Sequence, residues 1–354
     1  MAFELSRWRK TYIATALILA GLGALNTGIW FAAAHLFERG IENWAAAQRA
    51  QGWTVEYKSV AWSGFPWRWQ MTIEEPMLSS KKSGAPFHWS GPFIDLNLRP
   101  WSIRRIGFHT SGEHRLGYGT AREVDANRID IGAGHGDLLF AHKGNLKNIG
   151  IVVEGANFET KLAQTYRFTQ LNAQMDLDQQ GQSNTKPHQT PIFSLNAELF
   201  GLTLPKDLKP ALGQTISRIT LTADFLGTAQ GDTLKQALSN WAYSGGSLDL
   251  TKIELGWSKL DVSATGTLAL DSDLQPIVAM SGKVSGYGET LDQLADSGII
   301  KPGTAMVTRF ALRALANSTG DRKSEYIGVS FTIQDGYLHV GPVKLIKLPR
   351  IIWD

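Results

Sequence analysis

The sequence contains no cysteine among its 354 residues. This absence excludes disulfide frameworks, thiolate zinc sites, iron–sulfur clusters and cysteine nucleophiles. Charged residues make up only 19% of the chain, against roughly 25% in typical soluble domains. Because 43% of the residues are hydrophobic, the composition also excludes an intrinsically disordered chain. The length suits one large domain or two modest ones.

An excess of charge of one sign is missing as well. The chain carries 35 basic and 32 acidic residues, for a formal net charge of +3. This balance is untypical of a protein that binds nucleic acid over its whole surface. The sequence also lacks the motifs of zinc proteases, α/β-hydrolases and P-loop proteins. We therefore expect a protein that is not an enzyme, uses no cofactor and has no nucleic-acid partner.

One hydrophobic segment near the N-terminus is long enough to cross a membrane. No charged residue occurs from Thr11 to Ala34, and a helix of this length exceeds a hydrocarbon core of about 30 Å. Arg7, Arg9 and Lys10 precede it, and basic residues beside a first span favour a cytoplasmic N-terminus. The segment predicts a single-pass membrane anchor, with the main domain on the side of the membrane away from the cytoplasm. A cleaved secretory signal is the alternative, although its apolar region is usually shorter.

Asn26 is the one strongly polar side chain within this segment. Its amide either pairs with another helix or is tolerated near the end of the span. The next segment, residues 36–52, has apolar positions at helical spacing and ends at Gly52. It predicts a stalk helix that either lies against the following domain or forms a solvated spacer.

Beyond the stalk, apolar and polar residues alternate with the period of two that is typical of strands. This alternation occurs in residues 67–74, 94–99, 267–271 and 327–334. The residues that share the apolar face of the first of these strands are Trp67, Trp69, Met71 and Ile73. Residues 335–336, Asp-Gly, suit the two-residue turn of a hairpin. The pattern predicts a mainly β protein whose antiparallel sheet has one apolar face.

Helices are few and short beyond the stalk. The sequence predicts them at residues 232–241, with Asp232 as N-cap, at 289–295 and at 304–316. The last of them is expected to cover a sheet face. The predicted organisation is a cytoplasmic tail (residues 1–10), an anchor (11–35), the stalk (36–52), a first β-rich region (53–177), a polar linker (178–190) and a second β-rich region (191–354).

Residues that could perform chemistry are sparse. A local group of histidines and carboxylates consists of His109, Glu113, His114, Asp130, His135, Asp137 and His142. A metal site needs several donors that converge at about 2 Å, and these spacings enforce no convergence. We interpret the histidines as ordinary surface or turn residues. The glycine-rich run at residues 132–136 lacks a following helix start and predicts a turn.

Residues 99–105 place three arginines among aromatic and aliphatic side chains. Such a cluster either receives phosphate head groups at a membrane surface or ends a strand with one solvated face. The candidate contacts with lipid or with the membrane are Trp67, Trp69, Met71, Ile73, Arg99, Trp101, Arg104 and Arg105.

Three short motifs, at residues 64–66 (GFP), 89–92 (WSGP) and 99–101 (RPW), resemble those of an uncharacterised alphaproteobacterial family. Its members are membrane-anchored periplasmic proteins with a domain of unknown function. Residues 246–300 and 331–348 are similar in style to the C-terminal region of AsmA-type envelope proteins. That resemblance implies an elongated, curved antiparallel sheet, groove-like or sandwich-like, with an apolar inner face and a few short covering helices. It also implies an inner-membrane anchor and a role in lipid homeostasis.

Three functions follow as expectations. The first is binding or handling of lipid or another hydrophobic molecule in cell-envelope homeostasis, because one-faced strands outnumber the helices that could cover them. The second is a structural or assembly subunit with a membrane-protein partner. The third is an enzyme acting on envelope lipids or glycans, for which the sequence offers no catalytic constellation. The expected partners are the inner membrane and a hydrophobic ligand.

Overall fold

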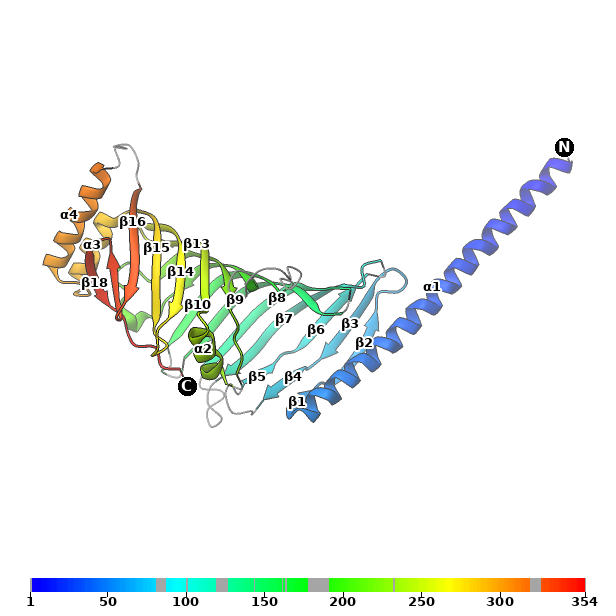
Figure 1. Ribbon diagram of the computed structural model, residues 1–354. Coiled ribbons are helices and arrows are strands. Elements are labelled where there is room, and N and C mark those ends of the chain that lie inside the picture. The colour runs from blue at the N-terminus through cyan, green and yellow to red at the C-terminus, as the bar shows by residue number, and fades with distance from the viewer. Residues whose placement is uncertain are drawn as a thin grey trace.

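One antiparallel sheet of 18 strands forms the body of the protein, and a long helix, α1, leads into it (Figure 1). The computed structural model describes residues 2–80, 87–99, 101–118, 127–142, 144–160, 162, 164–177, 191–231, 233–318 and 326–353. Figure 1 shows α1 projecting beyond the sheet, with α3 and α4 at the opposite end of the molecule. The mainly β, antiparallel fold expected from the sequence is confirmed.

The helices are α1 (Ala2–Ala50), α2 (Leu234–Tyr243), α3 (Tyr287–Asp296) and α4 (Pro302–Ser318), with a short 3-10 helix η2 (Lys206–Leu208). The first nine strands are β1 (Trp53–Glu56), β2 (Ser59–Ser63), β3 (Trp69–Glu74), β4 (Met77–Ser80), β5 (Phe87–Ser90), β6 (Phe93–Leu98), β7 (Arg105–Tyr118), β8 (Asn127–Phe140) and β9 (Leu146–Glu159). The others are β10 (Thr165–Asp176), β11 (Pro191–Thr203), β12 (Thr215–Leu226), β13 (Ser247–Trp257), β14 (Leu260–Leu270), β15 (Pro276–Ser285), β16 (Ile327–Gln334), β17 (Tyr337–Val340) and β18 (Val343–Lys347).

The strands follow a meander. From β7 onward each strand pairs with the next one along the chain. The six strands before β7 form three long strands, each interrupted once: β1 with β2, β3 with β4, and β5 with β6. In one half of this region β2 pairs with β3, β3 with β6 and β6 with β7. In the other half β1 pairs with β4, β4 with β5 and β5 with β7. Because β10 pairs directly with β11, the two predicted β-rich regions belong to one sheet. The predicted linker, residues 178–190, lies outside the described residues.

A line of irregular positions crosses the strands. It includes the interruptions between β1 and β2, β3 and β4, and β5 and β6. It continues at Gly112, Gly155 and Gly201, whose φ angles are 88°, 63° and 62°. These three glycines line one cavity of about 790 Å³. Bulges and glycine kinks bend strands locally, so the sheet changes direction along this line.

Local sequence signals account for most element boundaries. The alternating segments predicted at residues 67–74, 94–99, 267–271 and 327–334 contain or overlap β3, β6, β14 and β16. The predicted Asp335-Gly336 hairpin turn joins β16 to β17 with φ angles of 53° and 72°, which is the left-handed conformation such turns require. The N-cap of α2 is Thr233, whose side chain accepts from the backbone N–H of Gln236. The predicted cap, Asp232, lies outside the described residues.

The turn predicted at residues 132–136 is wrong, because this run lies inside β8. A Cβ atom at Gly136 would lie 2.0 Å from the carbonyl oxygen of Gly150 and 2.7 Å from the ring of Phe108. The glycine therefore makes room for an aromatic ring on the neighbouring strand. In the sequence alone, a glycine required by such a distant contact looks the same as a glycine required by a turn.

The predicted stalk is the C-terminal part of α1, and the helix is continuous with the predicted anchor. Of the two interpretations, it lies against the sheet. Ala45 is fully buried, and the guanidinium of Arg49 donates to the carbonyl oxygen of Val55 in β1 over 2.9 and 2.6 Å. The chain reverses direction at Gly52, whose φ angle is 88°.

Candidate functional site

One face of the sheet is apolar along almost its whole length, and we call it the apolar face. Opposed residues of antiparallel strands point to the same side, so the pairing register identifies the members of each row. One row runs through Trp69, Leu98, Ile106, Leu138, Ile149, Met175, Leu195, Ala223, Leu250, Gly266, Met280, Phe331, Val340 and Val343. At about 4.8 Å between strands, this row is roughly 60 Å long.

A second row of the same face lies two residues along the strands, or three in β13, where the register shifts between Leu250 and Ile253. It comprises Trp62, Met71, Leu96, Phe108, Gly136, Ile151, Ala173, Ala197, Leu221, Ile253, Ala264, Gly282 and Val329. The opposite face carries a mostly polar row: Thr72, Asp95, His109, His135, Val152, Asn172, Glu198, Thr220, Glu254, Ser263 and Lys283. The sheet is thus two-sided in chemistry from β3 to β15.

Helices cover the apolar face at its two ends. At one end, Leu291 of α3 and Leu312 of α4 pack in a cluster with Val284, Ile327 and Val329 of the sheet. This confirms the prediction that the third short helix covers a sheet face. At the other end, α1 supplies Trp30, Ala33, Ala34 and Phe37 to a cluster with four residues of the sheet, Trp62, Trp69, Leu98 and Ile106.

The helix α2 adds a smaller cover near the strand ends. Its Trp241 is 1% exposed, stacks on Phe225 with ring centroids 4.8 Å apart, and donates to the carbonyl oxygen of Leu226 at 2.7 Å. Between these covers the apolar side chains of the central strands, such as Ile151, Leu171 and Leu199, are only half-buried. The helices α1, α3 and α4 therefore cover the two ends of the apolar face, α2 covers its margin at β12, and the rest of its centre is partly open.

The eight candidate residues divide between two places. Trp69, Met71 and Ile73 lie in β3 on the apolar face, and the first two are 8% and 2% exposed. The others lie at the ends of the strands nearest to α1, in the turn between β2 and β3 and in the connection between β6 and β7. These are Trp67, Arg99, Trp101, Arg104 and Arg105, all of them exposed. Residue 100, in the RPW motif, lies outside the described residues.

We call the exposed side chains of residues 64–68, 99 and 101–105 the rim. It includes three members that the sequence analysis did not single out: Phe65, Arg68 and Ile103. Arg68, Arg99, Trp101 and Arg105 line one cavity of about 750 Å³. These segments are more than 30 positions apart in the sequence, and the β3–β6 pairing brings them together. No local pattern signals this proximity, so the sequence could not reveal the complete rim.

The rim is attached to α1 by three contacts. The Asn26 amide donates to the carbonyl oxygen of Pro66 at 3.2 Å, and the Trp30 indole N–H donates to that of Arg68 at 3.2 Å. The rings of Trp30 and Phe65 meet edge to face, with centroids 5.8 Å apart. Asn26 therefore has a partner within its own chain, and its presence no longer argues for a second membrane helix.

The GFP and WSGP motifs have local structural causes. Gly64 adopts a φ angle of 88°, and a Cβ there would lie 2.7 Å from the carbonyl oxygen of Arg68, so the turn between β2 and β3 requires glycine. A Cβ at Gly91 would lie 2.0 Å from Nδ1 of His114. Both motifs thus shape the sheet near α1 and have no need of a catalytic role.

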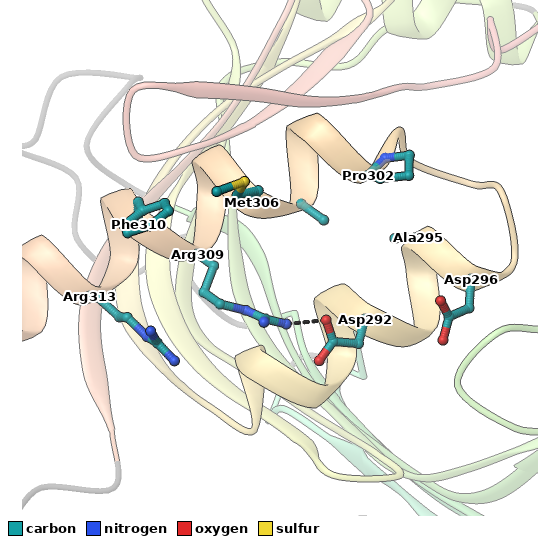
Figure 2. A pocket seen from close by; sticks show the side chains of 9 residues that line it. Asp292, Ala295, Asp296, Pro302, Met306, Arg309, Phe310 and Arg313 are labelled. Carbon is teal, nitrogen blue, oxygen red and sulfur yellow. Dashed lines mark hydrogen bonds and ion pairs between the residues drawn. The ribbon is translucent and has the colours of Figure 1, made fainter.

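A second concave surface lies between α3 and α4, in a cavity of about 430 Å³. Figure 2 shows the Arg309 side chain reaching from α4 to Asp292 of α3, with which it forms an ion pair. Arg309 also donates to the carbonyl oxygen of Gly288 at 3.0 Å. Met306 and Phe310 line the same cavity and are 61% and 60% exposed. Of the two arginines that line this cavity, Arg309 is therefore already paired with a carboxylate.

The histidines that are grouped in the sequence at residues 109–142 lie in different environments in the structure. His109 and His135 are cross-strand partners and exposed, whereas His114 is only 2% exposed and stacks on Trp89 with centroids 5.9 Å apart. Its Nε2 contacts the hydroxyl of Thr110, which donates to the carbonyl oxygen of Phe93 at 2.6 Å. The surface or turn interpretation is wrong for His114. Among the residues that the structure describes, no three metal-ligating side chains gather into a site.

Burial lowers the pKa of His114 below its ordinary value of 6.5, because the interior disfavours the charged imidazolium. In the unfolded chain His114 binds a proton near pH 6.5, whereas in the folded chain it remains neutral at that pH. We therefore expect the free energy of unfolding to fall as the pH decreases below about 6.5, by up to about 1.4 kcal/mol per pH unit. Urea unfolding across this pH range measures the slope. The slope should shrink in His114→Gln and persist in His109→Gln, and equal slopes in the two variants would contradict this assignment.

Comparison with known proteins identifies one family. Its model, described as "Uncharacterized protein conserved in bacteria (DUF2125)", matches residues 30–349. The match begins at Trp30, a member of the cluster in which α1 packs against the sheet, and it includes the whole sheet. No curated protein and no solved structure matches the chain. The chain therefore belongs to DUF2125, a family of uncharacterized proteins conserved in bacteria.

Proposed function

We propose that this protein is a non-enzymatic, single-pass inner-membrane protein whose periplasmic sheet binds lipid or another hydrophobic molecule. The observation that carries the proposal is the apolar face, which continues from β3 to β18 and is covered by α1, α3 and α4 at its ends and by α2 at the margin of β12. A half-buried apolar surface of this length needs a hydrophobic occupant, since contact with water is unfavourable.

The extent of the exposed surface supports an open arrangement. The solvent-accessible area is 22353 Å² for a chain of 38.9 kDa. A compact monomer of this mass is expected to expose about 14,000 Å². The projecting α1 accounts for part of the excess, and a sheet that does not close on itself accounts for a further part.

The membrane anchor of the proposal rests on α1. Residues 12–50 of this helix contain a segment long and apolar enough to cross a bilayer, and only 11% of the most apolar window is buried by the rest of the chain. The basic residues before the segment favour a cytoplasmic N-terminus, which would leave the sheet in the periplasm. The similarity in style to AsmA-type envelope proteins agrees with this placement.

Site-specific photo-crosslinking tests the proposal. The neighbouring positions Leu171 and Leu199 are opposed on the apolar face, and Asn172 and Glu198 are opposed on the polar face of the same two strands. With benzoylphenylalanine at each position in cells, we expect lipid adducts from Leu171 and Leu199 and none from Asn172 and Glu198. The adducts would be identified by mass spectrometry of the purified full chain. Equal labelling of both faces, or no lipid adduct at either leucine, would refute the proposal.

A second candidate is a subunit that assembles a membrane complex. It is favoured by α4, on which Met306, Val307 and Phe310 are 61%, 57% and 60% exposed. Neighbouring exposed apolar side chains on one helix are typical of a contact surface for another protein. The same experiment distinguishes the candidates, because benzoylphenylalanine at Val307 would then give a protein adduct while Leu171 and Leu199 gave no lipid.

A further inference from the structure

The level of the rim along α1 follows from the contacts of that helix. Lys10 precedes the uncharged segment, and Trp30 is 20 residues further along the same continuous helix. Twenty residues of α-helix rise about 30 Å, which is the thickness of a hydrocarbon core. If Lys10 lies at one membrane surface, Trp30 lies at the other. The hydrogen bonds from Asn26 and Trp30 to residues 66 and 68 then hold the rim at that second surface.

The rim has the composition of a membrane-contacting surface. Four of its large side chains point into solvent: Phe65 is 52% exposed, Trp67 73%, Trp101 71% and Ile103 60%. Aromatic side chains that combine a large apolar ring with a polar edge favour the interface between lipid and water. In a soluble environment this cluster would leave an unusual amount of aromatic surface in water.

The charge of the rim has one sign. Residues 64–68 and 99–105 include four arginines and no acidic residue. One arginine has a carboxylate nearby, with Arg105 Nε 3.7 Å from Asp137 Oδ2. Within the described part of the chain, no ion pair joins Arg68, Arg99 or Arg104 to an acidic side chain. Guanidinium groups without a carboxylate partner are well suited to bind phosphate oxygens.

We propose that the rim is a binding site for the phosphate groups of anionic phospholipids in the membrane that α1 crosses. Arg68, Arg99 and Arg104 bind the head groups, while Trp67, Trp101 and Ile103 enter the interface beside them. The contact holds the apolar face at the bilayer, because its first members, Trp62 and Trp69, share a cluster with Trp30, whose indole donates to the backbone of Arg68 in the rim. This inference rests on the proposed function for the membrane span of α1, and it adds the lipid class and the residues that recognise it.

The absence of cysteine permits a direct test with the full chain. Ile103→Cys would carry the only thiol, labelled with the environment-sensitive dye nitrobenzoxadiazole, in nanodiscs of phosphatidylcholine with or without phosphatidylglycerol. We expect a blue shift of the dye emission and its quenching by spin-labelled lipid, both larger with phosphatidylglycerol. An emission typical of water in both nanodiscs would overturn the proposal.

Matched charge variants identify the arginines as the cause. The combination Arg68→Gln, Arg99→Gln and Arg104→Gln should abolish the increase in blue shift and quenching that phosphatidylglycerol causes. The combination Lys235→Gln, Lys283→Gln and Lys301→Gln removes the same charge from exposed positions elsewhere. This variant should still show the increase in blue shift and quenching with phosphatidylglycerol. Equal responses of the two variants would contradict a specific site. All six residues are exposed, so both variants should unfold at the same urea concentration as the parent chain.

Three further outcomes separate this proposal from its alternatives. If inorganic phosphate alone reproduced the blue shift in phosphatidylcholine nanodiscs, the rim would bind a free anion and the membrane proposal would be wrong. If the rim gave no response while Leu171 and Leu199 still formed lipid adducts, the proposed function would stand without the anionic head-group site. Loss of the adducts with a normal rim response would overturn the function and leave the membrane contact intact.

Discussion

Replacement of Trp69 by alanine is expected to lower the free energy of unfolding by about 3–5 kcal/mol, as is typical of a buried tryptophan. Trp69 is 8% exposed and lies in the cluster that joins α1 to the sheet. Its ring centroid is 6.3 Å from that of Phe37 on α1. Removal of the indole leaves a cavity between helix and sheet, because the backbones of both elements are fixed by their own hydrogen bonds. Urea unfolding of the detergent-solubilised chain, followed by far-ultraviolet circular dichroism, measures the change.

Trp67 provides the matched control for this experiment. It lies two positions before Trp69, and its side chain is 73% exposed. Trp67→Ala should change the free energy of unfolding by less than about 0.5 kcal/mol, because an exposed side chain loses little packing. The same substitution should reduce membrane contact of the rim. Equal destabilisation by the two substitutions would show that the α1 junction is not packed as described.

A pair of glutamines on the apolar face is expected to reduce bound lipid at least about tenfold. Leu171→Gln with Leu199→Gln places two amides on opposed positions in the centre of the face. An acyl chain lying across them would bury polar groups without hydrogen-bond partners, at a cost of about 1–3 kcal/mol for each amide. Because both leucines are half-buried and not at the helix-covered ends, the fold should tolerate the change. Lipid mass spectrometry of the chain purified in mild detergent measures the ratio of lipid to protein.

The polar face again supplies the control. Asn172→Gln with Glu198→Gln changes the opposed residues one position along the same two strands. This variant should retain the lipid content of the parent chain. If both pairs lowered the lipid content equally, the loss would reflect general instability of β10 and β11. If neither pair changed it, the apolar face would not be the site of lipid binding.

The sequence predicted the elements whose signals are local. Alternation at β3, β6, β14 and β16, the Asp335-Gly336 turn and the three short helices all depend on neighbouring residues, and the structure contains each of them. The prediction failed where a local pattern had a distant cause. Gly136 of β8 makes room for Phe108 on β7, and His114 is buried by stacking on Trp89 of β5. Neither contact can be predicted from the residues that are nearby in the sequence.

The candidate site shows the same division. The sequence placed Trp67, Trp69, Met71 and Ile73 on one apolar strand face, which is confirmed for the last three and wrong for Trp67, an exposed residue of the turn before β3. It also identified the cluster of arginines and aromatics at residues 99–105. It did not reveal that Phe65 and Arg68 lie beside that cluster, since the register of β3 with β6 decides this. Whether Asn26 serves a partner helix was also open until its hydrogen bond to Pro66 was known.

By itself the sequence determined that this chain has a segment able to span a membrane, no thiol chemistry, and strands with one apolar side. Each of these properties depends on composition or on spacing over a few residues. Only the tertiary structure decided that the two predicted β-rich regions, residues 53–177 and 191–354, form one sheet. It also decided that their apolar sides join into a face from β3 to β18, and that α1 holds the rim beside this face. The physical reason is register: it is fixed by pairing between distant strands, and it determines which side chains become neighbours.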